Sequence, residues 1–203
     1  MSITLPKETV LLIIDVQNAI DNPEWCKYGK RNNCSAEDNM STILQLWRRS
    51  GWQVIHVKHE SLEPNSTYRP GDIGCDFKEC VFPIEGELVI IKHVNSAFIG
   101  TNLEATLRKI KITNLVIFGV ITNNSVEATV RMAGNLGFNT YLVEDATFTF
   151  AKPDYRGKIR AADEVHAMSL ANLNNEYCKV VCTNELVKII GDECNESNSE
   201  SFV

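Results

Sequence analysis

Residues 114–145, NLVIFGVITNNSVEATVRMAGNLGFNTYLVED, contain two short apolar runs separated by a helical pattern. The runs at 114–120 and 139–145 are rich in Val, Ile and Leu, which is typical of strands buried on both faces of a parallel sheet. Residues 123–137 between them have the spacing of a helix that ends at a glycine. The stretch therefore predicts a strand–helix–strand crossover.

The same alternation runs through most of the chain. Further apolar runs lie at 9–15, 52–59, 87–92 and 177–183. Further helical patterns lie at 35–51, 101–111 and 154–174. This order predicts an α/β fold with a doubly wound, mostly parallel six-stranded sheet and helices on both faces. One domain is expected over residues 1–190, and the polar, acidic segment 191–203 is expected to be a disordered tail.

The composition of the chain indicates which kinds of partner it binds and in which cellular compartment it is expected. The 203 residues carry a net charge of −6, which argues against nucleic acid or an acidic membrane as the main partner. No signal peptide or membrane-spanning run is visible in the sequence, so a cytoplasmic protein is expected. The seven cysteines are odd in number and scattered, which favours free thiols over a disulfide framework.

Three reactive side chains follow predicted strands at their carboxyl ends. Asp15 follows the first strand, Lys92 ends the third, and Ser125 lies just after the fourth. Ligands of open α/β sheets bind at this edge, so these three residues are candidates for one site. Each also has an ordinary structural interpretation. The aspartate can cap a turn, the lysine can be solvated, and the serine can bond the amides of its helix.

Three separated motifs resemble the isochorismatase-like, or cysteine hydrolase, superfamily. They are IIDVQNAI (13–20), IKHVNSAFIGTNLEATL (91–107) and the long stretch 115–146, and the resemblance extends from about residue 9 to about residue 190. It implies a catalytic triad of Asp15, Lys92 and the residue at position 125. It also implies an oxyanion hole formed by the backbone N–H groups of Ile121 and Ser125, preceded by a cis peptide bond between Val120 and Ile121.

Ser125 departs from this family pattern, because the superfamily has a nucleophilic cysteine there. An alcohol is essentially un-ionised at neutral pH and needs a strong base, usually histidine, yet no histidine matches a triad position. Only His59 and His93 stand at strand ends where they could face a pocket, whereas His56 and His166 suit a core or surface role. Three explanations stay open: an introduced Cys-to-Ser substitution, a natural serine with chemistry that needs no covalent intermediate, or an inactive small-molecule-binding relative.

The resemblance also implies the substrate pocket and the assembly. Five residues are expected to line the pocket: Asn18, Trp25, Tyr28, Phe98 and Ile121. Aromatic walls with few polar groups suit a small planar amide or an enol-ether acid, although Trp25 and Phe98 are equally compatible with packing roles. Related nicotinamidases bind a metal after the second strand, but the required Asp/His/His set does not follow His59 here, so neither a metal nor another cofactor is expected. Family members usually associate, which implies a homodimer or homotetramer.

The expected function is hydrolysis of a small molecule, with a C–N amide bond as the leading candidate. The alternatives are vinyl ether hydrolysis through acid catalysis by Asp15, as in isochorismatases, and a catalytically inactive binding protein. A dinucleotide-binding or phosphate-binding protein is disfavoured, because neither G-x-G-x-x-G nor G-x-x-x-x-G-K-[ST] occurs. A purely structural role would leave Asp15 and Lys92 unexplained.

Overall fold

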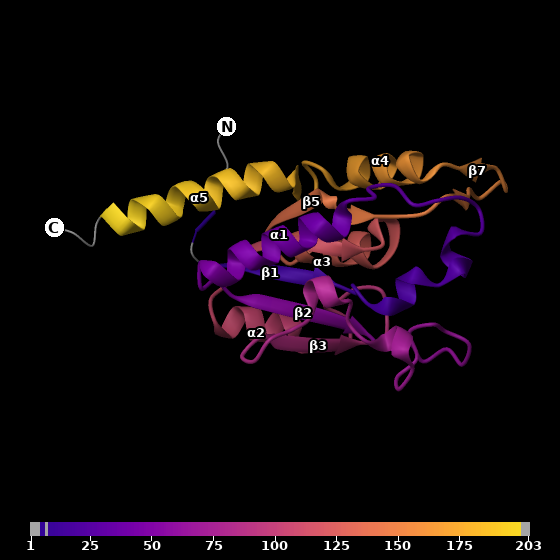
Figure 1. Cartoon of the computed structure of the whole chain (residues 1–203), viewed down its shortest axis with the longest axis horizontal. Coiled ribbons are helices and arrows are strands. Elements are labelled where there is room, and N and C mark those ends of the chain that lie inside the picture. The colour runs from indigo at the N-terminus through magenta and orange to yellow at the C-terminus, as the bar shows by residue number, and fades with distance from the viewer. Residues whose placement is uncertain (1–4, 7, 200–203) are drawn as a thin grey trace.

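A six-stranded parallel sheet runs through the centre of the computed structural model, which describes residues 5, 6 and 8–199 (Figure 1). The strands are β1 (Thr9–Ile14), β2 (Val54–His59), β3 (Leu88–Lys92), β4 (Asn114–Val120), β5 (Asn139–Phe148) and β8 (Lys179–Val181). Their order in the sheet is β3-β2-β1-β4-β5-β8, and every neighbouring pair is parallel. The chain starts in the middle of the sheet and winds outward in both directions, which confirms the predicted doubly wound topology.

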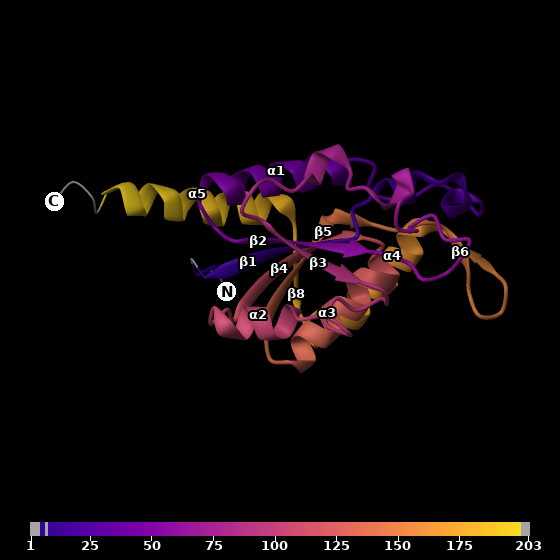
Figure 2. The same ribbon diagram turned by 90° about the horizontal axis from the view of Figure 1, so that it is seen from below.

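Helices cover both faces of the sheet, as the sequence predicted. They are α1 (Ala36–Arg49), α2 (Leu103–Lys109), α3 (Glu127–Asn135), α4 (Ala162–Leu173) and α5 (Thr183–Ser199). Helices α1 and α5 lie on one face, and α2, α3 and α4 lie on the other (Figure 2). In the described part of the chain, no helix has both the length and the apolar composition needed to cross a bilayer.

The alternation of side chains along β1 supplies both cores. Leu11 and Ile13 pack toward α1, whereas Leu12 and Ile14 pack toward α2 and α3, and all four are fully buried. Because a strand turns successive side chains to opposite faces, a strand with helices on both sides has to be apolar throughout. This explains the unbroken apolar run in the sequence.

One predicted helix begins later than the sequence indicated. Residues 154–161 do not belong to α4; they form most of a small antiparallel hairpin of β6 (Lys152–Pro153) and β7 (Ile159–Arg160). The Asp154 carboxylate accepts hydrogen bonds from the N–H groups of Arg156 and Lys158, and Gly157 has a φ of 83°. A carboxylate that bonds the next amides, followed by a left-handed glycine, favours a turn over a helix.

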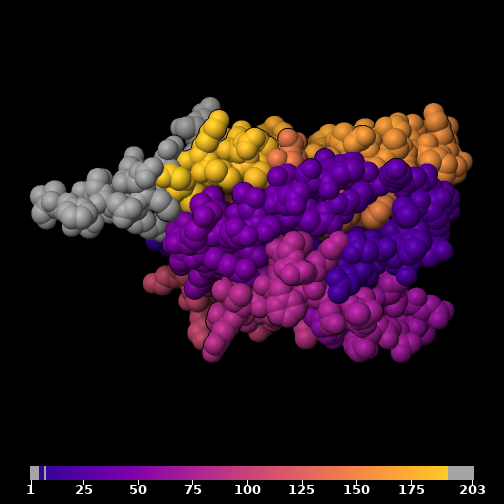
Figure 3. Space-filling view, in the orientation of Figure 1, coloured from indigo at the N-terminus to yellow at the C-terminus, as the bar shows by residue number. Residues whose placement is uncertain are grey.

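The acidic C-terminal segment also differs from its expected state. Helix α5 extends to Ser199 and so includes residues 191–199 of the expected disordered tail, while 200–203 lie outside the described residues. Leu186 and Ile190 are fully buried beside α1, and Figure 3 shows the two helices side by side on this surface. Once such packing forms the first turns, each added residue gains a backbone hydrogen bond, so the helix propagates into a polar sequence.

The close approach of β4 to β1 depends on a glycine beside the site. Gly119 pairs with Ile14, the last residue of β1, and has a φ of 142°. A Cβ at Gly119 would lie 2.1 Å from the Ile14 carbonyl oxygen, far inside van der Waals contact. The missing side chain therefore allows the ends of the two central strands to approach just before Asp15.

Candidate functional site

Lys92 stands at the centre of a buried polar cluster at the carboxyl edge of the sheet. Its Nζ lies 2.6 Å from Asp15 Oδ2 and 3.3 Å from Ser125 Oγ. Nζ also donates to the Val94 carbonyl oxygen at 3.1 Å. Three residues that are far apart in the sequence thus meet around one ammonium group, as their positions at strand ends predicted.

The cluster is almost sealed from solvent. Asp15, Lys92 and Ser125 are 3%, 1% and 8% exposed. Burial raises the pKa of Asp15 and lowers the pKa of Lys92, while the attraction between the two opposes both shifts. A buried charge persists in such a place only with a partner, so each of these two residues stabilises the ionised form of the other.

The two carboxylate oxygens of Asp15 differ in their surroundings. Oδ2 binds Lys92, whereas the buried Oδ1 has no hydrogen-bond partner among the described residues. The Ser125 hydroxyl is close enough to lower the pKa of Asp15, although its hydrogen-bond geometry is met only with Lys92. A buried, unsatisfied carboxylate oxygen costs free energy and often marks a functional site. It can accept a proton from an approaching group.

His59 adds a fourth group that the sequence identified only as a residue at a strand end. Its Nδ1 lies 3.3 Å from Lys92 Nζ. Burial and the neighbouring lysine lower the pKa of His59 to about 4, so the ring is neutral at neutral pH and can accept a hydrogen bond from Lys92. Gln17 fixes the residue by bonding both its backbone N–H, at 2.7 Å, and its carbonyl oxygen, at 2.9 Å.

Tyr68 is a further residue beside the cluster, and the sequence did not single it out. Its ring packs edge-on against His59 and Trp25, with centroids 5.5 and 6.4 Å apart. Burial raises the pKa of Tyr68 well above its usual value, and the charge of Asp15 raises it further. The only sequence signal was a single aromatic residue in a polar loop, and only folding brings that loop over the site.

Ser125 lies in an irregular turn rather than in a regular helix. The π-type turn η5 (Thr122–Val126) precedes α3, and Asn124 has φ −135° and ψ −105°, far from helical values. The serine does not cap the helix. The peptide bond between Val120 and Ile121 is cis, which confirms that detail of the resemblance.

The five residues expected in the pocket divide into two groups. Trp25 stacks on Phe150 at 6.1 Å, and these rings continue the aromatic wall formed by Tyr68. Ile121 is half-buried against the core beside the turn. Three lie in other surroundings: Asn18 bonds the Ile73 carbonyl, Tyr28 is largely exposed beside Lys27, and Phe98 is buried against Phe138.

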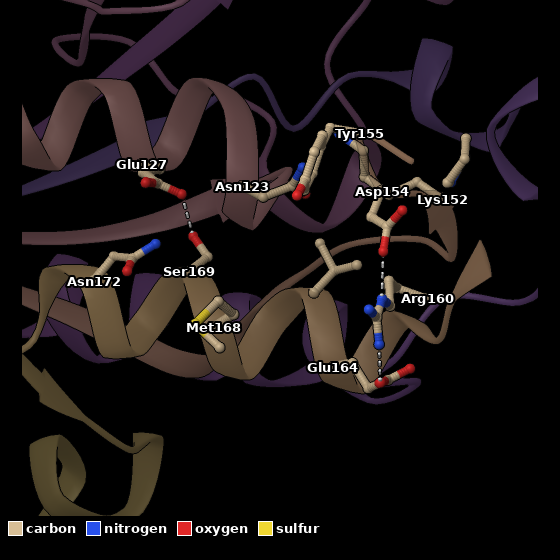
Figure 4. A pocket seen from close by; sticks show the side chains of 12 residues that line it. Asn123, Glu127, Lys152, Asp154, Tyr155, Arg160, Glu164, Met168, Ser169 and Asn172 are labelled. Carbon is tan, nitrogen blue, oxygen red and sulfur yellow. Dashed lines mark hydrogen bonds and ion pairs between the residues drawn. The ribbon is translucent and has the colours of Figure 1, made fainter. Parts of the chain in front are cut away.

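A separate cavity of about 530 Å³ lies on the other side of the turn, between α3, α4 and the hairpin (Figure 4). Its lining includes Asn123, Glu127, Tyr155, Arg160, Met168 and Ser169. Asp15, Lys92 and Ser125 do not line it, so the cavity adjoins the segment that carries the serine without containing the cluster.

The described residues contain no group of three His, Cys, Asp or Glu side chains arranged to hold a metal ion. His59, the histidine in the region where related nicotinamidases bind a metal, has its Nδ1 occupied by Lys92. The polar groups of the site are instead arranged around an ammonium ion and are suited to proton transfer.

Comparison with known proteins shows the family of this chain. The profile of the isochorismatase domain matches residues 9–185. The Bacillus subtilis isochorismatase family protein YrdC is 44% identical over 183 residues, which cover 90% of this chain and 96% of that protein. The ureidoacrylate amidohydrolase RutB of Agrobacterium fabrum is 30% identical over 211 residues, covering 87% and 91%.

A solved structure extends the similarity to three dimensions. The crystal structure of an isochorismatase-family protein from Chromobacterium violaceum superposes with a TM-score of 0.90 at 52% identity, covering 95% of this chain and 98% of that one. The close superposition, the domain match over most of the sequence and the high identity have one explanation. The chain belongs to the isochorismatase family of hydrolases.

Proposed function

We propose that this chain hydrolyses a C–N amide bond in a small molecule, with Ser125 as nucleophile, Asp15 as general base and Lys92 as their electrostatic partner. The observation that carries the proposal is the contact of a single buried ammonium group, Lys92 Nζ, with both Asp15 Oδ2 and Ser125 Oγ. The similarity to an enzyme named ureidoacrylate amidohydrolase supports amide chemistry.

The serine hydroxyl is essentially un-ionised at neutral pH and needs a base to remove its proton, and Asp15 is suited to that role. Burial raises the pKa of this carboxylate, so it takes up a proton more readily than an exposed aspartate does. Its free Oδ1 provides the lone pair. Serine is still a weaker nucleophile than the thiol of its relatives, which predicts slow turnover.

The proposed steps conserve atoms and charge. Asp15 accepts the Ser125 proton as Oγ bonds to the carbonyl carbon, and the resulting oxyanion is stabilised by the backbone N–H groups of Ile121 and Ser125. The C–N bond then breaks as Asp15 returns the proton to the departing nitrogen. Asp15 then deprotonates water, which attacks the acyl carbon, and the bond from that carbon to Oγ breaks as Asp15 returns the proton to Ser125 Oγ and the acid is released. The aromatic wall of Trp25 and Tyr68 suits a planar substrate.

Vinyl ether hydrolysis is the second candidate, and the same raised pKa favours it. Burial raises the pKa of Asp15 and so favours its protonated form, which can protonate the double bond of an enol ether, and water then completes the cleavage. In that case Ser125 has no covalent role, and Lys92 holds the substrate carboxylate.

Hydrolysis of one panel by three forms of the protein separates the candidates. Small amides and an enol-ether acid are offered to the wild type and to Ser125→Cys and Ser125→Ala. For the amidase, the cysteine form should be at least about tenfold faster on an amide and the alanine form inactive. Enol-ether turnover that is equal in the Ser and Ala forms would establish the alternative. Ligand-induced thermal stabilisation with no turnover by any form would indicate a binding protein.

We further propose that the chain acts in the cytoplasm as a homodimer or homotetramer. The six cysteines whose side chains the structure describes are all free thiols, which suits a reducing compartment. Assembly is supported by the family resemblance alone. Light scattering at micromolar concentration should give a multiple of the 22.8 kDa chain mass, and a monomer would contradict this proposal.

A further inference from the structure

Helix α4 contacts the turn that carries Ser125 at two polar points, both through Thr122. Thr122 Oγ1 lies 2.8 Å from His166 Nδ1, and the Thr122 carbonyl accepts a hydrogen bond from Ser169 Oγ at 3.3 Å. All three residues are buried, at 0%, 8% and 3% exposure. These contacts adjoin Ile121, whose N–H belongs to the proposed oxyanion hole, and lie three residues before Ser125.

The protonation state of His166 follows from its two partners. The backbone carbonyl of Glu144 raises the pKa of His166, so it favours a proton on the ring nitrogen that faces it. Nδ1 is then the acceptor, and Thr122 donates its hydroxyl proton to it. Burial lowers the pKa of His166, although Asp163 and the Glu144 carbonyl oppose this shift, and the ring is neutral at neutral pH.

The turn depends on such contacts because its backbone is not a regular helix. Asn123 and Asn124 both have non-helical dihedral angles, so continuous helical hydrogen bonding does not fix the segment. Ser169 is less able to hold it than His166, because its one proton is directed to the Glu127 carboxylate at 2.6 Å, a shorter contact than the one to Thr122. Figure 4 shows this bond between Ser169 and Glu127.

We propose that His166 is a positioning residue for the nucleophile turn. Its neutral ring fixes the Thr122 hydroxyl, 2.8 Å from Nδ1, and through it the Ile121 N–H and the Ser125 side chain. The inference rests on the proposed role of Ser125. A displacement of about 1 Å at a nucleophile costs on the order of 10²-fold in rate, so a hydrogen bond outside the site can control turnover.

Three substitutions test this role. Thr122→Val keeps the shape and removes the donor, His166→Phe keeps a ring and removes the acceptor, and His166→Asn keeps an acceptor close to the position of Nδ1. These substitutions are made in whichever form of position 125 hydrolyses an amide fastest. There, Thr122→Val and His166→Phe should each lower kcat about 10²-fold and change KM less than about threefold, whereas His166→Asn should retain most of the rate. The double variant should be no slower than either single one, because both changes remove the same bond.

A second measurement requires no substrate. In the Ser125→Cys background, the alkylation rate by iodoacetamide reports the placement of the thiol beside Lys92, and Thr122→Val or His166→Phe should lower it about tenfold. Met168→Leu, on the exposed side of α4, is the matched control and should change nothing. If no form hydrolyses an amide, the proposed function fails, and alkylation still decides the role of His166. Unchanged kcat and alkylation in folded variants, or a rise in KM alone, would overturn the inference.

Discussion

The side chain of Lys92 reaches Asp15 past one intervening strand of the sheet, with Nζ 2.6 Å from Oδ2 in a place where neither residue is more than 3% exposed. β3 is an edge strand and β1 is central, with β2 between them. The long lysine side chain spans this distance and ends at the proposed nucleophile. A buried pair of this kind couples stability to function, because removing one charge leaves the other without a partner.

Asp15→Asn should abolish hydrolysis, lowering kcat/KM by about 10³-fold, because both candidate mechanisms use this carboxyl for proton transfer. It should also destabilise the fold by about 3 kcal/mol, because Lys92 remains buried and unpaired. Asp15→Asn/Lys92→Met removes both charges and should recover most of the stability without recovering activity. Denaturant unfolding and turnover of the three forms measure these effects separately. Activity in either variant would contradict the proposed base.

His59 should make the protein sensitive to mild acid. Its pKa is about 4 in the folded state, below its ordinary value of 6.5, so the unfolded chain binds a proton first as the pH falls. The stability that neutral His59 provides is therefore complete above pH 6.5 and is lost as the pH falls toward 4. We expect a loss of about 1 to 2 kcal/mol, reduced by partial solvent screening. Urea unfolding at pH 7 and 4.5 should show a smaller loss in His59→Gln than in the wild type.

Glu87 should contribute stability over a more acidic range. It binds Arg48 through both oxygens, at 2.7 and 2.8 Å, and lies 2.8 Å from His56 Nε2. These partners and the Ile84 N–H lower its pKa to about 2 despite burial, so its contribution is complete above pH 4.5 and is lost as the pH falls to 2. Glu87→Gln should cost about 2 kcal/mol at pH 7 and almost nothing near pH 2. The exposed Glu85→Gln is the control, and equal thermal shifts in both variants would exclude a special role for Glu87.

Gly119→Ala should destabilise the fold by about 3 kcal/mol or more, because its Cβ would overlap the Ile14 carbonyl and its φ is strained for any L side chain. The clash lies one residue before Asp15, so remaining folded protein should also lose activity. Gly191→Ala, where a Cβ meets nothing within 4 Å in helix α5, should instead raise stability by about 0.5 to 1 kcal/mol. Melting temperatures of the two variants test the contrast, and a shift of the same sign in both would contradict it.

The fold was largely predictable because its signals are local. Each buried strand requires a continuous apolar run, and each covering helix requires a stripe at helical spacing, so the order of elements could be inferred without knowledge of long-range contacts. The errors occur where local signals compete. The charged segment 154–161 resembled a helix start, yet Asp154 and Gly157 favour a turn. At the C-terminal end, the packing of buried residues of α5 extended a helix into a polar segment.

The sequence by itself determined the sheet, the family motifs and the convergence of Asp15, Lys92 and Ser125, because parallel strands place their carboxyl ends at one edge. Only the tertiary structure decided which other side chains lie around these three residues or hold the turn that carries Ser125. His59, Tyr68 and His166 come from a strand end, a loop and a distant helix, and a single histidine or tyrosine has no spacing pattern that distinguishes a site residue from a core residue. Their roles depend on hydrogen bonds of 2.8 to 3.3 Å and ring contacts between segments up to 44 residues apart, which exist only after the core has packed.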